Sequence, residues 1–362
     1  MNSNDKVGFI YVLLLLVTTV GLINHVIMIP TLYEVAGRDS WLSVIFTFFL
    51  VLPWLLVIPF IARRTQQQHL AKWIKSNSPK ALAYPLMFFI VVFLFLTATV
   101  TTNDLIIWTN ITYLPQTPKL VIILIFISIC VYLALTNIRT IVIVNTILLP
   151  IVIFLGIFVA TTNMPNKDYS LLLPVFVDGF RPMLTGMIFT TACILEVFMI
   201  LFLQHKIKNK INYVGLVIVT LFLILLGLGP VMGGIAAFGP DAVIKERFPA
   251  YIQWQLVSIG RFIEHLDFFS IYQWLSGALI RISLTLYVLA EVLQIDDKKK
   301  RRRFLLVVGS LIVIVTLLPI NDLLFVSFIK NIYLPFNLIF LSLLSLILFI
   351  LIVIKGKGKN PK

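Results

Sequence analysis

The chain has 362 residues, of which 60% are hydrophobic and 12% charged, and its mean hydropathy is +1.04. Soluble globular chains average about 45–50% apolar and about 25% charged residues, so this composition excludes a soluble protein and indicates a polytopic membrane protein. The net charge of +14 does not indicate a nucleic-acid partner, because the basic residues alternate with apolar stretches as membrane topology signals do.

Ten apolar stretches of roughly membrane-spanning length follow one another along the sequence. The first is too long for a cleaved secretory signal and is followed by no small-residue cleavage site, so we expect it to be retained as a helix. The ninth is short, and only Asn137 and the basic Arg139 mark the division between the fourth and the fifth. The approximate bounds are 7–29, 41–61, 83–107, 119–136, 138–160, 183–204, 212–238, 268–293, 304–319 and 332–354. The sequence therefore predicts an all-α protein in which residues 1–362 form a single transmembrane domain.

The distribution of Lys and Arg predicts the orientation of these spans. With ten spans and a cytoplasmic N-terminus, 20 of the 29 basic residues fall in cytoplasmic segments and eight in outer segments. This asymmetry follows the positive-inside rule and predicts an integral membrane protein with both termini cytoplasmic, including a basic tail at 355–362. The run KKKRRR at 298–303 either binds anionic membrane lipids or only anchors the topology.

Ten spans divide into two sets of five, at about residues 1–160 and 161–354. Because five is odd, the second set runs through the membrane inverted relative to the first. In transporters built from such inverted repeats, broken helices at equivalent positions form a ligand site near the bilayer midplane. We therefore expect a 5+5 inverted repeat, similar to amino-acid permeases, with helices 1 and 6 broken.

Polar residues collect in these two corresponding helices. Span 1 contains the stretch TTVGLINHVIMIP, and span 6 contains the stretch TTACILE. Two interpretations remain open: these residues line a central ligand site, or they bond back to their own helix and its neighbours, as is common in membrane bundles. The residues concerned are Thr18, Thr19, Gly21, Asn24, His25 and Pro30 in span 1, and Thr190, Thr191 and Glu196 in span 6.

Glu196 lies within an otherwise apolar stretch of span 6. A charge at the centre of a membrane helix costs about 2.5–3.5 kcal/mol on insertion scales, so an acid there indicates a functional role or a partner. Arg281 in span 8 is one possible partner, although we expect a direct pair to need a tilt or a kink. The alternatives are a carboxyl that is protonated or binds a cation, and a structural acid held between helices.

Two segments of the second half have features of their own. The stretch GLGPVMGG at 227–234 predicts a kink or hinge at Pro230 in span 7. Apolar residues at three- and four-residue spacing over 248–269 predict an amphipathic helix on the outer face, either a gate or docking surface or a seal for the bundle.

No motif indicates catalysis or a cofactor. The sequence contains no nucleophile elbow, no paired-histidine zinc motif and no phosphate loop. Four histidines, His25, His69, His205 and His265, lack the spacing of metal ligands. Both cysteines fall within spans, where a thiol behaves as a small buried hydrophobe. We therefore expect no enzyme, no metal site and no cofactor.

Four stretches carry a resemblance to a known family. They are AGRDSWLSV at 36–44, YLPQTP at 113–118, LLLPVFVDGFRPMLTG at 171–186, and FGP at 238–240 with Pro249 and SIGRFIEHLDFFSIYQW at 258–274. In this order they resemble the spore germination permease family, the B subunits of endospore germinant receptors, within the amino acid–polyamine–organocation superfamily. The chain departs from the family at helix 1, where a GxGIL pattern is usual, and at helix 3, where Asp104 has no arginine nearby.

The resemblance implies a subunit that recognises a small nutrient germinant, typically an amino acid, in the spore inner membrane. Its implied partners are a larger A subunit and a lipoprotein C subunit. The superfamily fold implies a ligand site between helices 1, 3, 6 and 8, with Glu196 and Arg281 in coupling or ion binding. By position, the candidate ligand residues are Thr18, Thr19, Gly21, Asn24, Val100, Thr101, Thr190, Thr191 and Thr285.

Two other functions need the same architecture. One is an active amino-acid transporter, a proton- or cation-coupled symporter, which uses the same site as a sensor. The other is an ion or water conduit that the receptor complex opens. The sequence does not separate these from a sensor, because the three differ in what crosses the membrane.

Overall fold

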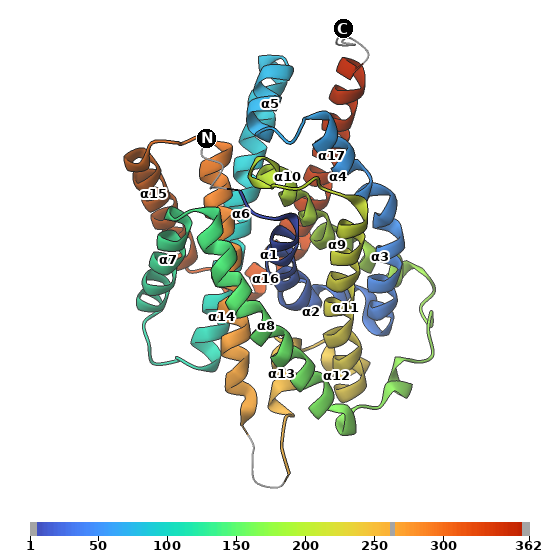
Figure 1. Cartoon of the computed structure of the whole chain (residues 1–362). Coiled ribbons are helices and arrows are strands. Elements are labelled where there is room, and N and C mark those ends of the chain that lie inside the picture. The colour runs from blue at the N-terminus through green and yellow to red at the C-terminus, as the bar shows by residue number, and fades with distance from the viewer. Residues whose placement is uncertain (1–5, 261–264, 357–362) are drawn as a thin grey trace.

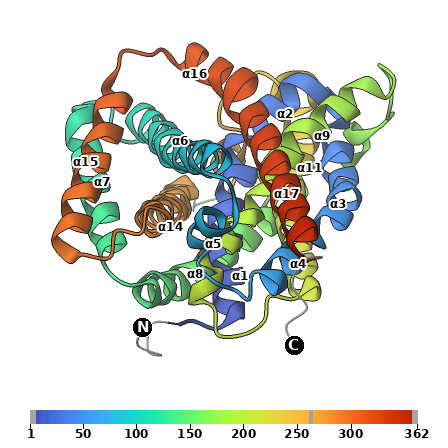
Figure 2. The ribbon, with the colours of Figure 1, turned by 90° about the horizontal axis from the view of Figure 1, so that it is seen from above.

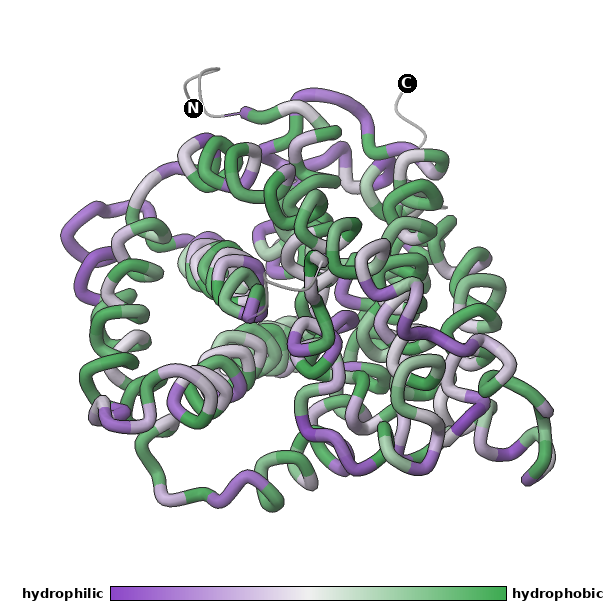
Figure 3. Tube along the Cα trace, turned by 90° about the horizontal axis from the view of Figure 1, so that it is seen from below, coloured by the Kyte–Doolittle hydropathy of each residue, from purple (hydrophilic) through white to green (hydrophobic). Residues whose placement is uncertain are grey.

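The computed structural model describes residues 6–260 and 265–356, and within them it is a bundle of helices (Figure 1). The described residues contain no strand, and a single parallel bridge joins Val7 to Ile207. The segment leading into the first helix and the end of the last helix lie at the same end of the bundle. Figure 3 shows hydrophobic residues along most of the helices and hydrophilic residues concentrated in the connections.

The first half contains eight α-helices. They are α1 (Phe9–Leu22), α2 (Ile29–Ala36), α3 (Ser40–Leu55), α4 (Val57–Arg64), α5 (Leu70–Asn77), α6 (Lys80–Thr112), α7 (Lys119–Leu135) and α8 (Ile138–Thr162). A π-helix, η2 (Ile23–Ile27), connects α1 to α2, and the 3-10 turn η3 (Gly37–Asp39) connects α2 to α3. The 3-10 turns η4 (Met164–Asn166) and η5 (Tyr169–Leu172) follow α8.

The described residues of the second half form nine α-helices, several of them short. They are α9 (Arg181–Ile194), α10 (Met199–Leu203), α11 (Tyr213–Phe238), α12 (Pro240–Val243), α13 (Pro249–Gln255), α14 (Phe269–Val292), α15 (Lys298–Leu317), α16 (Asp322–Phe328) and α17 (Leu334–Gly356). The 3-10 turns η6 (Leu195–Phe198), η7 (Gln204–Lys206) and η8 (Leu266–Phe268) and the π-helix η9 (Ile329–Tyr333) extend or join them.

Eight helical segments of the described chain are long and apolar enough to cross a membrane. They are Phe9–Ile27, Ile29–Arg64, Lys80–Thr112, Ile138–Thr162, Arg181–Lys206, Tyr213–Phe238, Leu266–Val292 and Asp322–Lys355. The other two predicted spans coincide with α7, which is short at 17 residues, and with α15, which begins with the basic run. These two helices pack against each other (Figure 2). Eight of the ten predicted spans are therefore long and apolar enough to cross a membrane. That all ten cross it stays a prediction.

Three of these segments form the centre of the bundle. The most apolar part of Arg181–Lys206 is 89% buried, that of Leu266–Val292 is 83% buried and that of Phe9–Ile27 is 78% buried. The corresponding values for the other five lie between 28% and 44%, so those segments present one side to the surroundings. The polar residues of spans 1, 6 and 8 are thus shielded from lipid by other helices.

Spans 1 and 6, which we expected to be broken, each contain a change of helical pitch, but their backbone stays largely helical. In span 1 the π-helix Ile23–Ile27 and a bend at Met28 separate α1 from α2. In span 6 the 3-10 turn Leu195–Phe198 separates α9 from α10. Such changes of helical pitch are frequent at functional sites. A further π-helix, Ile329–Tyr333, lies within the segment Asp322–Lys355, which begins ten residues before the predicted span 332–354 and which we also call span 10.

Pro230 lies inside the continuous helix α11. Because proline has no N–H, the carbonyl of Leu226 four residues earlier loses its helical donor. The side chain of His25 replaces that donor, with Nδ1 2.9 Å from the Leu226 oxygen. The hydroxyl of Tyr33 donates to the Pro230 and Val231 carbonyls at 3.1 and 2.8 Å. The interruption of helical hydrogen bonding around Pro230 is therefore compensated by side chains of η2 and α2.

The predicted amphipathic helix over 248–269 is wrong in its extent. The helix α13 covers Pro249–Gln255 only, and α14 is preceded by the short turn Leu266–Phe268. Gly260 (φ +65°) and His265 (φ +60°) have left-handed backbone, which an α-helix cannot contain. Residues 261–264 of the predicted helix lie outside the described residues.

Candidate functional site

Glu196 and Arg281 form an ion pair at the centre of the bundle. Glu196 lies in η6 and Arg281 in α14, and the bond is bidentate, with Nη1 2.6 Å from Oε2 and Nη2 3.0 Å from Oε1. Both side chains are 0% exposed. The two residues lie at equal sequence separations from the first residues of their spans, Arg181–Lys206 and Leu266–Val292, and Glu196 lies within the 3-10 turn that interrupts its span.

The remaining contacts of Arg281 extend to three other helices. Its Nε donates to the hydroxyl of Thr101 in α6 at 2.9 Å, and its Nη1 donates to the backbone carbonyl of Thr19 in α1 at 2.6 Å. Its Nη2 also lies 3.3 Å from the hydroxyl of Tyr333. Helices 1, 3, 6 and 8, which the family resemblance implied for the ligand site, therefore meet at this guanidinium.

Span 10 supplies two groups that sequence reasoning missed. The Tyr333 hydroxyl and the Asn337 amide both donate to Oε1 of Glu196, at 3.3 and 3.1 Å. These residues are four apart in an otherwise apolar stretch, which is the signal that one face of span 10 is polar. Tyr333 ends the π-helix of that span, so its direction could not be derived from regular α-helical spacing. We call Glu196, Arg281, Thr19, Thr101, Tyr333 and Asn337 the central network.

The central network stabilises charges that water does not reach. Removing a carboxylate and a guanidinium from water costs several kcal/mol per ion, and mutual attraction offsets this only with close geometry and further hydrogen bonds. Here the bidentate pair supplies the geometry, and five further hydrogen bonds from Thr19, Thr101, Tyr333 and Asn337 supply the rest. Loss of either charge would leave the other uncompensated in the core of the bundle.

Other candidate ligand residues lie near or behind this network. Thr285 donates to the Arg281 carbonyl at 2.7 Å, one turn further along α14. Thr191 is 8% exposed, and its buried hydroxyl has no hydrogen-bond partner among the described residues. Val100 is 2% exposed and contributes an apolar side chain next to Thr101.

Four candidates make contacts between helices away from the network. Thr18 donates to Asn145 of α8 at 2.6 Å, and Asn24 donates to the Leu223 carbonyl of α11 at 2.6 Å. Thr190 shares a hydrogen bond with Thr47 of α3. Gly21 lies against α11, where an added Cβ would meet Leu226 and Leu223. The second interpretation of the polar residues, bonding between helices, therefore describes these positions.

A cavity of about 440 Å³ lies beside α1, and its lining contains no residue of α6, α9 or η6. Its walls come from α1, α8, α11, α13 and α14. Of the candidate ligand residues, Thr18 and Gly21 line it. The space between helices 1, 3, 6 and 8 is filled by the central network, and the cavity is a separate feature.

A second ion cluster joins α6 to the loop that precedes α13. Arg247, just before α13, donates to Asp104 of α6 at 2.8 Å and to both carboxylate oxygens of Asp322 of α16, at 2.9 and 3.1 Å. Burial opposes the charge of Arg247, but the two carboxylates hold its pKa above the usual value. The arginine that seemed to be missing from the vicinity of Asp104 is thus supplied by a loop far away in sequence.

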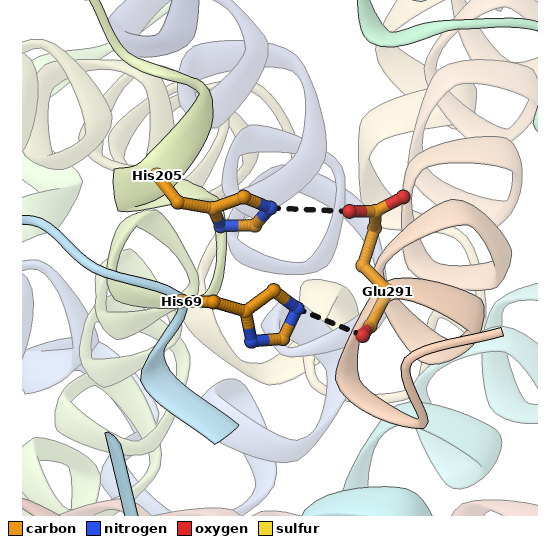
Figure 4. A group of neighbouring side chains, drawn as sticks. All are labelled: His69, His205 and Glu291. Atoms are coloured by element: carbon orange, nitrogen blue, oxygen red, sulfur yellow. Dashed lines mark hydrogen bonds and ion pairs between the residues drawn. The ribbon is translucent and has the colours of Figure 1, made fainter. Parts of the chain in front are cut away.

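Two of the four histidines meet at the opposite end of the bundle (Figure 4). His205 lies 3.1 Å from the Glu291 carboxylate, and His69 lies 2.9 Å from the Glu291 backbone carbonyl. One nitrogen of each imidazole and a carboxylate oxygen lie within 4.8 Å of one another, an arrangement of metal-ligand types that sequence spacing did not reveal. However, Arg301 and Lys206 lie 2.7 and 3.6 Å from the same carboxylate and compensate its charge. The cluster is therefore better described as a junction between span ends than as a cation site.

This junction predicts a dependence of stability on pH. Burial, and then the neighbouring His205, lower the pKa of His69 to about 4, whereas an unfolded histidine titrates near 6.5. Between these values the unfolded chain binds a proton that the folded protein does not, so stability is full above pH 6.5 and falls toward pH 4. The thermal unfolding midpoint in detergent is expected to fall across this window, and to fall less in His69→Gln.

The exposed His265 provides the matched control for this experiment. His265→Gln is expected to retain the pH dependence of the unmodified protein. An equal pH dependence in His69→Gln and the unmodified protein would show that His69 is not the group responsible.

Comparisons with known proteins agree with one another. A family model described as "Spore germination protein" matches residues 8–324. "Spore germination protein XB" of Bacillus anthracis is 38% identical over 356 residues, which cover 98% of this chain and 99% of that protein. "Putative spore germination protein YfkT" of Bacillus subtilis is 26% identical over 264 residues, which cover 70% of each chain.

Proposed function

This chain belongs to the spore germination protein family, and from that premise we propose that it is the small-molecule-sensing membrane subunit of a spore germinant receptor. The family and the apolar helices support an integral membrane protein that acts in germination. The proposed ligand is an amino acid, bound between helices 1, 3, 6 and 8. The proposed partners are the A subunit and the lipoprotein C subunit, and the proposed location is the spore inner membrane with both termini cytoplasmic.

The pattern of helix contacts supports ten helices in a 5+5 inverted repeat. If helix n of one half corresponds to helix n+5 of the other, α3 corresponds to α11, α6 to α14 and α7 to α15, and each of these pairs is in contact. The contact of α1 with α8 has a counterpart in that of α9 with α17, and the contact of α1 with α11 in that of α9 with α3. On this correspondence α7 and α15 are helices 4 and 9.

The central network is the observation that carries the proposed function. An amino acid at neutral pH presents a carboxylate, which suits the planar guanidinium of Arg281, and an ammonium, which suits the Glu196 carboxylate. A zwitterion inserted between them would leave neither charge unpaired. The Thr101 hydroxyl and the Thr19 carbonyl, which already bond to Arg281 at 2.9 and 2.6 Å, would complete the site.

Signalling then follows from competition between two arrangements. In the first, Glu196 and Arg281 bind each other and hold helices 6 and 8 together. In the second, the ligand lies between them and the helices separate. A ligand that binds the second arrangement more tightly shifts the population toward it, and the partner subunits detect the change.

The experiment is a binding and uptake measurement on the reconstituted protein with a panel of amino acids. We expect saturable binding of at least one amino acid and no binding of its amide or its decarboxylated amine, because each analogue would leave one buried charge unpaired. Thr101→Val is expected to weaken binding roughly tenfold or more, since a hydrogen bond to a charged group contributes about 1.5–3 kcal/mol. Thr146→Val is the matched control, because its hydroxyl bonds to its own helix on an exposed face.

The outcomes separate the competing functions. Binding without uptake supports a sensor. Uptake against a gradient that is lost in Glu196→Gln would make the protein a coupled transporter, and a leak on ligand addition would make it a conduit. Equal binding of the amide analogue, or no binding by either the isolated chain or its complex with the partner subunits, would contradict the proposed site.

A further inference from the structure

The cavity of about 440 Å³ has a strongly apolar lining. The helix α1 packs between α8 and α11 (Figure 1), and the cavity borders all three. Most of its wall consists of aliphatic and aromatic side chains from these helices, together with Trp254 of α13 and Trp274 of α14. No residue of the central network lines the cavity, so the two features can be considered separately.

The cavity opens sideways between α8 and α11. Three of its lining residues are exposed: Ile157 of α8 at 59%, and Phe222 and Leu225 of α11 at 42% and 55%. All three lie in segments that are long and apolar enough to span the membrane, so their exposed sides face the bilayer core. In a bilayer, lipid would therefore contact the mouth of the cavity.

The polar groups along the wall already have partners. The Gln273 side chain donates to the Val152 carbonyl at 3.0 Å and accepts from Trp254 Nε1 at 2.9 Å. Gln253 donates to the Pro230 carbonyl at 3.0 Å, and Thr18 donates to Asn145 at 2.6 Å. A polar ligand would have to break these bonds, whereas an apolar chain would leave them intact.

Lys167 is the charged residue of the lining, and it lies at the end of the cavity just beyond α8. Its Nζ is 3.4 Å from the Ala160 carbonyl, and within the described residues it has no carboxylate partner. Partial burial lowers its pKa. An ammonium that is partly removed from water, and that lies at the edge of a membrane span, gains from an anionic phosphate.

We propose that this cavity binds an acyl chain of an anionic phospholipid, which enters between α8 and α11 and places its phosphate at Lys167. Thr18 borders the cavity, and the carbonyl of the next residue, Thr19, binds Arg281. A chain in the cavity would therefore support the part of α1 that holds the central network. The proposal does not depend on what the network binds.

Fluorescence quenching by brominated lipid tests this proposal, because quenching needs contact between bromine and the indole. Trp254 lines the cavity but is only 3% exposed, so lipid outside the bundle does not reach it. A variant that retains Trp254 alone, with the other tryptophans changed to Phe, is reconstituted in lipid with brominated acyl chains. We expect a large loss of its fluorescence relative to unbrominated lipid. A variant that retains Trp73 alone, which is 9% exposed, lies in α5 and is outside the lining, is expected to lose little.

A plugged cavity separates entry of the chain from quenching at a distance. Gly229 is an exposed residue of the lining, and a Cβ there would meet nothing within 4 Å, so Gly229→Leu can add a side chain at the mouth of the cavity. This change is expected to protect Trp254 from quenching. Absence of quenching of Trp254 would overturn the proposal, and it is also the result expected if a partner helix occupies the mouth of the cavity. Equal quenching with and without Gly229→Leu would overturn the proposal as well.

The headgroup is tested by comparing brominated phosphatidylglycerol with brominated phosphatidylcholine. Stronger quenching by the anionic lipid is expected, and Lys167→Gln should abolish the difference. Equal quenching by the two lipids in the unmodified protein would overturn the assignment of the phosphate to Lys167. Size-exclusion profiles identical to that of the unmodified protein establish that each variant is folded.

Discussion

Glu196→Gln is expected to destabilise the protein by about 3–5 kcal/mol, because it leaves the Arg281 guanidinium charged and buried with no counter-ion. Both side chains of the pair are fully buried, so water cannot take over the lost interaction without entering the bundle. The Tyr333 hydroxyl and the Asn337 amide also lose a charged acceptor. The measurement is the free energy of unfolding in detergent, from denaturant titration.

The double variant Glu196→Gln/Arg281→Met provides the decisive comparison. Replacing both members of a buried pair with groups of similar volume is often neutral or even stabilising, so the double variant should recover most of the loss. The cycle of single and double variants gives the coupling energy of the pair. If the double variant is no more stable than Glu196→Gln, the pair is not the dominant interaction of these two residues.

The same double variant separates stability from ligand recognition. If the pair only holds helices 6 and 8 together, a stable double variant will bind amino acids as the unmodified protein does. If the pair provides the ligand site, the variant will be folded and unable to bind. If the pair provides the ligand site, stability and binding are therefore both lost in the single variants, whereas the double variant recovers stability and not binding.

The sequence predicted part of the central network, because the free-energy cost of a charged residue in an apolar stretch can be recognised from the sequence alone. A carboxylate in the apolar stretch around Glu196 demands a partner, and Arg281 was among the possibilities. Tyr333 and Asn337 were missed, because a π-turn sets the direction of Tyr333 and nothing in the residues before it predicts that turn. The need for a counter-ion can be inferred from a buried charge itself. The direction of a side chain depends on the pitch of the backbone, which the sequence does not reveal.

Other features depend on distances between segments far apart in the chain. His69, His205 and Glu291 come from three different segments, so no spacing in the sequence could reveal their meeting. The cavity is lined by residues of five helices, and no pattern within one helix reveals the space that is left between them. The predicted helix at 248–269 was wrong because apolar periodicity does not register the left-handed backbone at Gly260.

The central network and the cavity lie on either side of one short stretch of α1. Thr18 faces the cavity and α8, and the Thr19 carbonyl faces Arg281. The π-helix that follows, at Ile23–Ile27, is bonded to α11 through Asn24 and His25. Any movement of α1 therefore alters the ion pair, the cavity and the contact with span 7 together. This coupling is what a sensor needs if ligand binding in the core is to change a distant surface.

Arg247→Leu is expected to lower stability by about 1.5–3 kcal/mol, the range for hydrogen bonds to charged groups. The change leaves Asp104, whose side chain is 1% exposed, without its cation. The bond to Asp322 contributes less, because that carboxylate is 33% exposed and can be solvated by water. Lys245→Leu in the same loop removes an exposed lysine and is expected to leave stability unchanged. Equal effects of the two changes would mean that the loop charge, and not the contact with Asp104, is responsible.

Arg247→Leu is also expected to tighten amino-acid binding. Arg247 joins α6 to α16, and these elements belong to spans 3 and 10, which contribute Thr101 and Tyr333 to the central network. Without this contact the arrangement in which Glu196 and Arg281 bind each other loses support, so the ligand-binding arrangement is more populated and the apparent Kd falls. The double variant Asp104→Asn/Arg247→Leu, which removes the unpaired buried charge, should regain stability and retain the tighter binding. An unchanged Kd in both variants would show that the cluster stabilises the fold without biasing the conformations that bind the ligand.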